Sequence, residues 1–164
     1  IPVYVARYGM DLGPDAHETA IGAGDLDFKP GALRFELSNY NYMGLATVEP
    51  SLDLIHAIGV QKIEAHVRGL AARLASGFLE LGLPVAGGPP GPQLAHIVAV
   101  GESGGGRHYG ADDPAMNDLY EHLTANNVGI SIRRGILRMS VAVYNNADDI
   151  DRVLELSRDW VNGR

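Results

Sequence analysis

Residues 131–140 read SIRRGILRMS, and they predict two strands that meet at a turn around Gly135. Aliphatic residues continue on both sides of this stretch, so we expect the strands to cover residues 128–133 and 136–144. Three arginines, at positions 133, 134 and 138, lie within these strands and their turn.

Helical periodicity is found before and after this pair of strands. Apolar residues recur at three- and four-residue spacing over residues 42–58, 60–80 and 114–126, which predicts three amphipathic helices. Residues 94–100 form an apolar run that is typical of a buried strand. A fourth helix is expected after an N-cap at Asn145 or Asn146, because two aspartates follow where the helix dipole favours negative charge.

The predicted order is helix, helix, strand, helix, strand, strand, helix. This order indicates an α/β protein with two layers, in which helices cover one face of a small sheet of about three to five strands. Residues 1–37 contain many glycines and prolines and show little periodicity, so we expect an irregular arm at an interface. Residues 38–164 would then form the folded domain.

The composition restricts the possible functions. None of the 164 residues is cysteine, which excludes disulfides, thiolate metal sites and a cysteine nucleophile in this chain. The net charge of -7 argues against nucleic acid or an acidic membrane surface as partner, and no apolar run approaches the ~20 residues of a membrane span. We therefore expect a cytoplasmic protein with no nucleic-acid or membrane partner. Because the chain begins with isoleucine, we expect a processed product, a proteolytic fragment or an engineered boundary.

Other candidate sites have weaker support in the sequence. Residues 101–111 are rich in glycine but lack the lysine and hydroxyl residue of a phosphate-binding loop, so a flexible linker is favoured over a phosphate site. A hydrogen-bonded position in the core is predicted for His96, which lies in the expected buried strand. The histidines do not have the spacing of a metal site, and they are His17, His56, His66, His96, His108 and His122.

The stretch at residues 131–140, followed by YNNADDID at residues 144–151, resembles a block near the C-terminus of class V aminotransferase-like enzymes. These are fold type I pyridoxal 5'-phosphate (PLP) enzymes, in a superfamily with cysteine desulfurases and isopenicillin epimerase-like proteins. The resemblance implies that this chain is the C-terminal small domain of such an enzyme. In the family, the arginine of an Arg-x-Ser element holds the substrate α-carboxylate, and by position that arginine is Arg138.

The physical chemistry of arginine supports this role. A guanidinium is a planar fork that meets a carboxylate through two parallel hydrogen bonds, and a strand fixes its direction better than a loop. Arg133 and Arg134 would add positive charge to the same pocket, and we predict Arg138 and Arg133 as substrate-binding residues. The alternative is that all three arginines are surface or interface groups in ordinary ion pairs.

A second block, RFELSNYN at residues 34–41, resembles the family's stretch that leads into a Gly-Thr turn. In many relatives that threonine reaches the PLP phosphate of the partner subunit. Ser38 and Asn39 stand in place of the glycine and threonine here, and the resemblance implies that both bind the cofactor, through a hydroxyl and an amide. A turn before a helix N-terminus is the alternative, and both roles are compatible.

The resemblance also identifies what this chain lacks. The family's Schiff-base lysine, and the aspartate that pairs with the pyridinium nitrogen, belong to a large domain that precedes this segment. Lys29 and Lys62 do not have the expected neighbours, so the chain alone is expected to bind no PLP, to contain no catalytic or metal-binding residue and to be inactive. The large PLP-binding domain is therefore an expected partner.

The implied parent is a homodimeric enzyme with PLP as cofactor. It would act on an amino acid or keto acid by transamination, epimerisation or lyase cleavage. Desulfurase chemistry of the family's type is disfavoured, because Gly135 passes directly to Ile136 and no cysteine is present. A non-catalytic binding or dimerisation module with the same fold is the alternative function.

Overall fold

The computed structural model describes residues 28–35 and 41–164. The chain divides into two units, Ile1–Asp53 and Leu54–Arg164, and the second unit contains the sheet and the hydrophobic core. No helix within the described ranges is long and apolar enough to cross a membrane.

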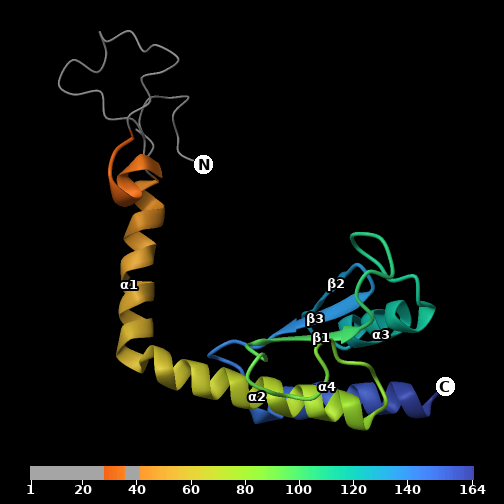
Figure 1. Cartoon of the computed structure of the whole chain (residues 1–164). Coiled ribbons are helices and arrows are strands. Elements are labelled where there is room, and N and C mark those ends of the chain that lie inside the picture. The colour runs from red at the N-terminus through yellow and green to blue at the C-terminus, as the bar shows by residue number, and fades with distance from the viewer. Residues whose placement is uncertain (1–27, 36–40) are drawn as a thin grey trace, which may run out of the picture. The chain divides into compact units, whose positions relative to one another are not determined.

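The described residues form one sheet of three antiparallel strands, in the order β1-β3-β2 (Figure 1). The strands are β1 (Ile97–Gly101), β2 (Ser131–Arg133) and β3 (Ile136–Ser140). β3 is the central strand, because it pairs with β1 along its whole length and with β2 next to the turn.

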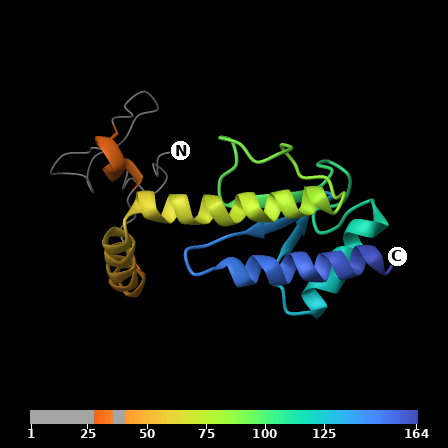
Figure 2. The same cartoon turned by 90° about the horizontal axis from the view of Figure 1, so that it is seen from below.

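Three helices, α2 (Val60–Glu80), α3 (Pro114–Ala125) and α4 (Ala147–Asn162), lie on one face of this sheet (Figure 1). α2 and α4 run side by side (Figure 2), and α3 packs against α4, β2 and β3. The predicted two-layer α/β fold with a small sheet is therefore confirmed.

The core lies between the sheet and these helices. Alternate strand residues point toward the helices, and four of them, Val98, Val100, Leu137 and Met139, are buried and oppose one another across β1 and β3. From the helix side, Leu74 and Phe78 of α2 and Leu119 and Leu123 of α3 fill the same space, together with Ile150 and Leu154 of α4.

Gly77 sets how closely α2 and α4 approach each other. A Cβ atom at this position would overlap the side chain of Leu154 on α4. Because helix interfaces are packed as densely as crystals, a larger residue at position 77 would require the Leu154 side chain or the two helices to shift.

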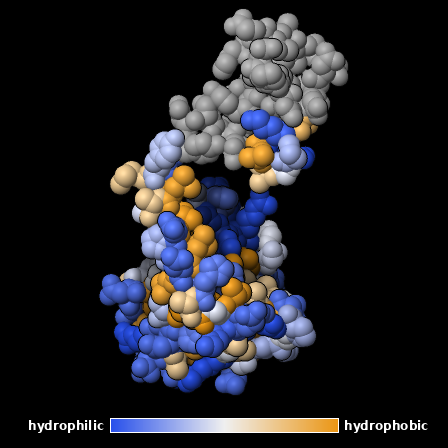
Figure 3. Space-filling model, turned by 90° about the vertical axis from the view of Figure 1, so that its left-hand side faces the viewer, coloured by the Kyte–Doolittle hydropathy of each residue, from blue (hydrophilic) through white to orange (hydrophobic). Residues whose placement is uncertain are grey.

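α1 (Tyr42–Ile58) forms as predicted but buries none of its side chains. Its apolar residues, Leu45, Val48, Leu52, Leu54 and Ile55, are between 40% and 62% exposed. Figure 3 shows hydrophobic side chains on this surface of the chain. The amphipathic pattern thus predicted the helix correctly, while its apolar side is not covered by any described residue.

The strands are shorter than predicted, and the prediction for His96 is wrong. β1 begins at Ile97, and His96 is exposed immediately before it. The reason is that β3 ends opposite Ile97, at Ser140, so residues 94–96 have no partner strand. The backbone carbonyl of His96 accepts the last hydrogen bond of the ladder, from the Val141 N–H at 2.8 Å.

The outer edge of β1 is also paired over part of its length. Val85 forms an isolated antiparallel bridge with Val100. The Ala86 N–H donates to the Ala99 carbonyl at 2.8 Å, and the Gly101 N–H donates to the Pro84 carbonyl at 2.8 Å. Residues 84–86 therefore satisfy backbone groups that would otherwise face solvent.

α4 starts with a capping box at one of the two predicted positions, Asn146. The Asn146 Oδ1 atom accepts from the backbone N–H groups of Asp148 and Asp149. In return, the Asp149 Oδ2 atom accepts from the Asn146 N–H at 3.0 Å and from the Asn145 side-chain amide at 3.1 Å. The backbone hydrogen bond from Asn146, and then that from the Asn145 amide, lower the pKa of Asp149 below its ordinary value.

We expect Asp149→Asn to lower the stability of the chain at neutral pH and to have little effect in acid. A carboxyl whose pKa is lower in the folded state stabilises the fold above its unfolded pKa, and this contribution is lost as the pH falls through the folded pKa. Urea unfolding at pH 7 and at a pH below the folded pKa of Asp149 would measure the two differences. A destabilisation of equal size at both pH values would contradict this role of the charge.

Candidate functional site

Arg138 lies at the middle of the central strand, on the face of the sheet that the helices leave open. Its neighbours Leu137 and Met139 are buried against the helices, so strand alternation turns Arg138 to the opposite face. Across the sheet Arg138 pairs with Ala99 on β1 and with Ser131 on β2. Both neighbours are small, which leaves space around the half-buried arginine.

Arg133 lies on the same open face. It pairs with Ile136, two residues before Arg138 on β3, so the two arginines are diagonal neighbours, with Cα atoms about 7–8 Å apart in ordinary sheet geometry. The structure therefore brings both predicted substrate-binding residues together. Their role as substrate ligands remains a prediction.

Neither arginine of this face is neutralised by a described carboxylate. The ion pairs of the described residues are Arg68–Glu64, Arg73–Asp151 and Arg152–Glu155, all with partly exposed side chains. The Nη1 atom of Arg133 is buried and has no hydrogen-bond partner among these residues. The open face of the sheet thus carries two positive charges that no carboxylate of the described residues pairs.

Arg134 has a different environment from the other two arginines. It is exposed and forms a two-residue turn with Gly135, with φ values of 46° and 89°. Positive φ at both positions is what a type I' hairpin turn requires, and it is costly for a residue with a Cβ atom. Arg134 therefore belongs to the turn rather than to the open face of the sheet.

The glycine-rich connection of residues 102–113 packs against this turn. The Gly104 N–H donates to the Arg134 carbonyl at 3.0 Å, and the Arg134 N–H donates to the Arg107 carbonyl at 3.2 Å. The Gly135 N–H donates to the Gly110 carbonyl at 3.1 Å. The segment links β1 to α3, as predicted, and backbone hydrogen bonds also attach it to the β2–β3 hairpin.

This connection places Tyr109 against Arg133. The Arg133 guanidinium carbon lies 4.5 Å from the centre of the Tyr109 ring, within the range of a cation–π contact. The His108 ring meets the Tyr109 ring edge-on, with centroids 4.4 Å apart. Sequence analysis did not identify Tyr109, because a lone tyrosine in a glycine-rich loop gives no signal of its contact across the sheet.

Two substitutions in the turn should have opposite effects on stability. We expect Arg134→Asn to raise the free energy of unfolding by about 1 kcal/mol, because asparagine tolerates positive φ better than arginine. We expect Gly135→Ala to lower it by at least about 1 kcal/mol, because the positive φ disfavours a Cβ atom. That atom would also overlap the carbonyl oxygens of Gly105 and Glu102. Urea denaturation would measure both, and a Gly135→Ala variant as stable as the parent chain would show that the connection does not pack on the turn.

The predicted cofactor-binding residues, Ser38 and Asn39, lie outside the described residues. Lys62 is exposed on α2, and Lys29 is half-buried in the first unit. Over the ranges that the structure describes, no cluster of three or more potential metal ligands is found.

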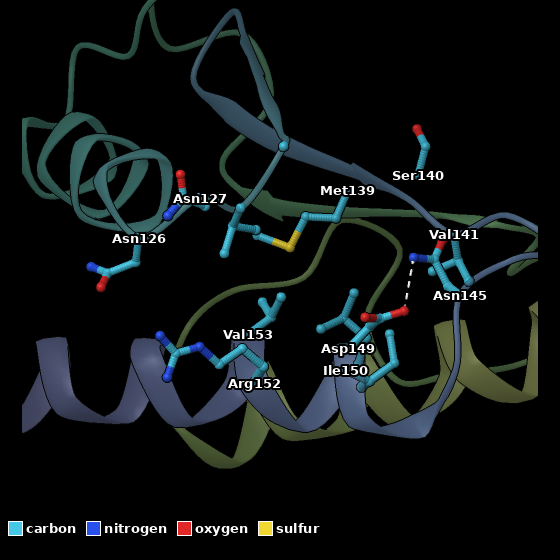
Figure 4. A pocket seen from close by; sticks show the side chains of 13 residues that line it. Asn126, Asn127, Met139, Ser140, Val141, Asn145, Asp149, Ile150, Arg152 and Val153 are labelled. Carbon is cyan, nitrogen blue, oxygen red and sulfur yellow. Dashed lines mark hydrogen bonds between the residues drawn. The ribbon is translucent and has the colours of Figure 1, made fainter.

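A cavity of about 250 Å³ opens on the helix side of the sheet (Figure 4). Leu74, Met139 and Ile150 contribute apolar surface, while Asn127 and Arg152 contribute polar groups. The hydrogen bond from Asn145 to Asp149 lies at its edge. Because Arg138 and Arg133 project from the other face of the sheet, this cavity is separate from the pair of arginines.

Comparison with solved structures identifies the fold. A cysteine desulfurase from Thermococcus onnurineus NA1 superposes with a TM-score of 0.66 at 20% sequence identity, over 89% of this chain and 38% of that chain. The cysteine desulfurase CsdA from Escherichia coli gives a TM-score of 0.63 at 15% identity, over 94% of this chain and 39% of that chain. This is the fold of class V, fold type I PLP enzymes.

A serine palmitoyltransferase from S. paucimobilis with bound PLP–myriocin aldimine gives a TM-score of 0.62 at 14% identity, over 84% of this chain and 35% of that chain. The chain thus spans less than half the length of these fold type I proteins. No protein-family model and no curated protein matches the sequence. The resemblance found in the sequence is therefore confirmed at the level of the fold.

Proposed function

We propose that the chain is the C-terminal small domain of a PLP-dependent class V aminotransferase-like enzyme, and that Arg138 binds the α-carboxylate of its amino acid or keto acid substrate. The observation that supports this role most directly is the position of Arg138. It lies at the centre of the open face, between two small neighbours, with no described ion-pair partner.

Arg138 would bind and orient the substrate. Its guanidinium can donate two parallel hydrogen bonds to a carboxylate, which fixes the direction of the bond from the carboxylate to the α-carbon. β3 holds the Cα atom of Arg138 through backbone pairing on both sides, so the arginine is positioned before the substrate arrives.

The described residues do not fit the cofactor as they fit a carboxylate. Lys62 projects from an exposed site on α2, and Lys29 lies in the other unit. α2, which carries Lys62, packs on the face of the sheet opposite to Arg138. We assign the Schiff-base lysine and the aspartate for the pyridinium nitrogen to a large domain, and the phosphate contacts of Ser38 and Asn39 to a homodimer interface. PLP would supply the electron sink for chemistry at the α-carbon.

The chain alone should therefore be inactive. After incubation with PLP and borohydride reduction, we expect mass spectrometry to find no stoichiometric adduct at Lys29 or Lys62. Such an adduct, accompanied by turnover of an amino acid, would contradict the assignment of the lysine to another domain.

Arg138→Gln is the test of the carboxylate role in the assembled protein. When the chain is produced together with the lysine-bearing large domain, we expect this substitution to raise KM for the amino acid about 10- to 100-fold, the effect of losing hydrogen bonds to a charged group. Arg158→Gln is the matched control, because Arg158 is exposed on α4.

Stability measurements would separate a role in binding from a role in folding. Since Arg138 has no described partner, Arg138→Gln should change the free energy of unfolding by no more than about 0.5 kcal/mol. An unchanged KM would refute the carboxylate role. Assembly without turnover would favour the non-catalytic dimerisation module.

A further inference from the structure

The side chain of Arg133 makes no hydrogen bond or ion pair with any described residue, although its Nη1 atom is buried. A buried donor without an acceptor is rare in folded proteins and costs stability, more so when the group is charged. The buried Nη1 atom of Arg133 is the one side-chain nitrogen or oxygen in this condition among residues 28–35 and 41–164. Arg133 as a whole is only half-buried, so the rest of its unpaired side chain stays within reach of a partner from outside the described residues.

The position of Arg133 indicates where that partner would bind. Arg133 lies on the open face beside Arg138, displaced by one diagonal step of the sheet. Arginine side chains are long enough to converge across such a step. A ligand with two acidic groups could therefore meet one guanidinium with each group.

Tyr109 leaves Arg133 available for this contact. The tyrosine ring covers the flat side of the guanidinium at 4.5 Å, whereas hydrogen bonds to a carboxylate leave from the edge of the guanidinium plane. Backbone hydrogen bonds hold the connection of residues 102–113 to the hairpin turn. Tyr109 thus positions Arg133 without using any of its donors.

We infer that the substrate is an amino or keto acid with a second carboxylate on its side chain, held by Arg133 while Arg138 holds the α-carboxylate. This inference rests on the proposed function and makes Arg133 the residue that selects for dicarboxylates. Tyr109 is a positioning residue, because it acts on the ligand through Arg133.

The experiment uses the chain as it is, with succinate as the dicarboxylate probe and butyrate as the monocarboxylate of equal length. NMR signals of the arginine Nε–Hε groups would follow each titration. We expect succinate to bind at least about tenfold more tightly than butyrate, with shifts at both Arg133 and Arg138. Butyrate should shift Arg138 alone.

Variants separate the two arginines. Arg133→Gln should abolish the preference for succinate and leave butyrate binding unchanged, whereas Arg138→Gln should weaken the binding of both probes. Tyr109→Phe should retain the preference, because the ring remains, and Tyr109→Ala should reduce it. Arg158→Gln is the control. Should Arg133→Gln fail to fold, Arg133→Met retains an apolar stem against Tyr109 and removes the unpaired donor.

Equal binding of the two probes, or a preference for succinate that survives Arg133→Gln, would overturn the inference. If butyrate binding still depended on Arg138 in that case, the proposed function would stand and the dicarboxylate selection alone would fall. If neither probe shifted the NMR signal of Arg138, both the proposed function and the dicarboxylate selection would be refuted.

Discussion

The alternation of side chains along β3 is the constraint on which both faces of the domain depend. Leu137 and Met139 are buried against the helices, and each such side chain stabilises the fold by about 1.5–3 kcal/mol. A slip of the register by one residue would expose both and drive Arg138 beneath the helices, where an unpaired charge is unfavourable. Burial of two apolar residues therefore determines where the intervening guanidinium points.

Backbone hydrogen bonds connect the strands of the core to the segments that hold the two arginines. The hairpin turn at Arg134 and Gly135 joins the two strands that carry Arg133 and Arg138. The connection from β1 to α3 is hydrogen-bonded to the same turn, and it brings Tyr109 over Arg133. The arginine face is thus built on the three paired strands and on a loop that is tied to them.

Much of the fold could be predicted from the sequence, because periodicity and capping are local signals. The positions of α2 and α3, and the cap at Asn146, follow from residues that are near one another in the chain. Strand ends depend instead on where a partner strand stops, which explains why His96 was wrongly placed in the core.

The candidate site was predicted only in part, because some of its residues are found through local motifs and others through contacts between distant segments. Arg138 and Arg133 were found through a local motif, and strand alternation places both on one face. The contact of Tyr109 depends on backbone hydrogen bonds between distant segments, and these can be made by any residue type.

The edges of the sheet illustrate a further consequence of pairing. Residues 84–86 occupy the outside of β1, and β2 has three residues, so little unpaired strand remains to recruit another chain into edge-to-edge aggregation.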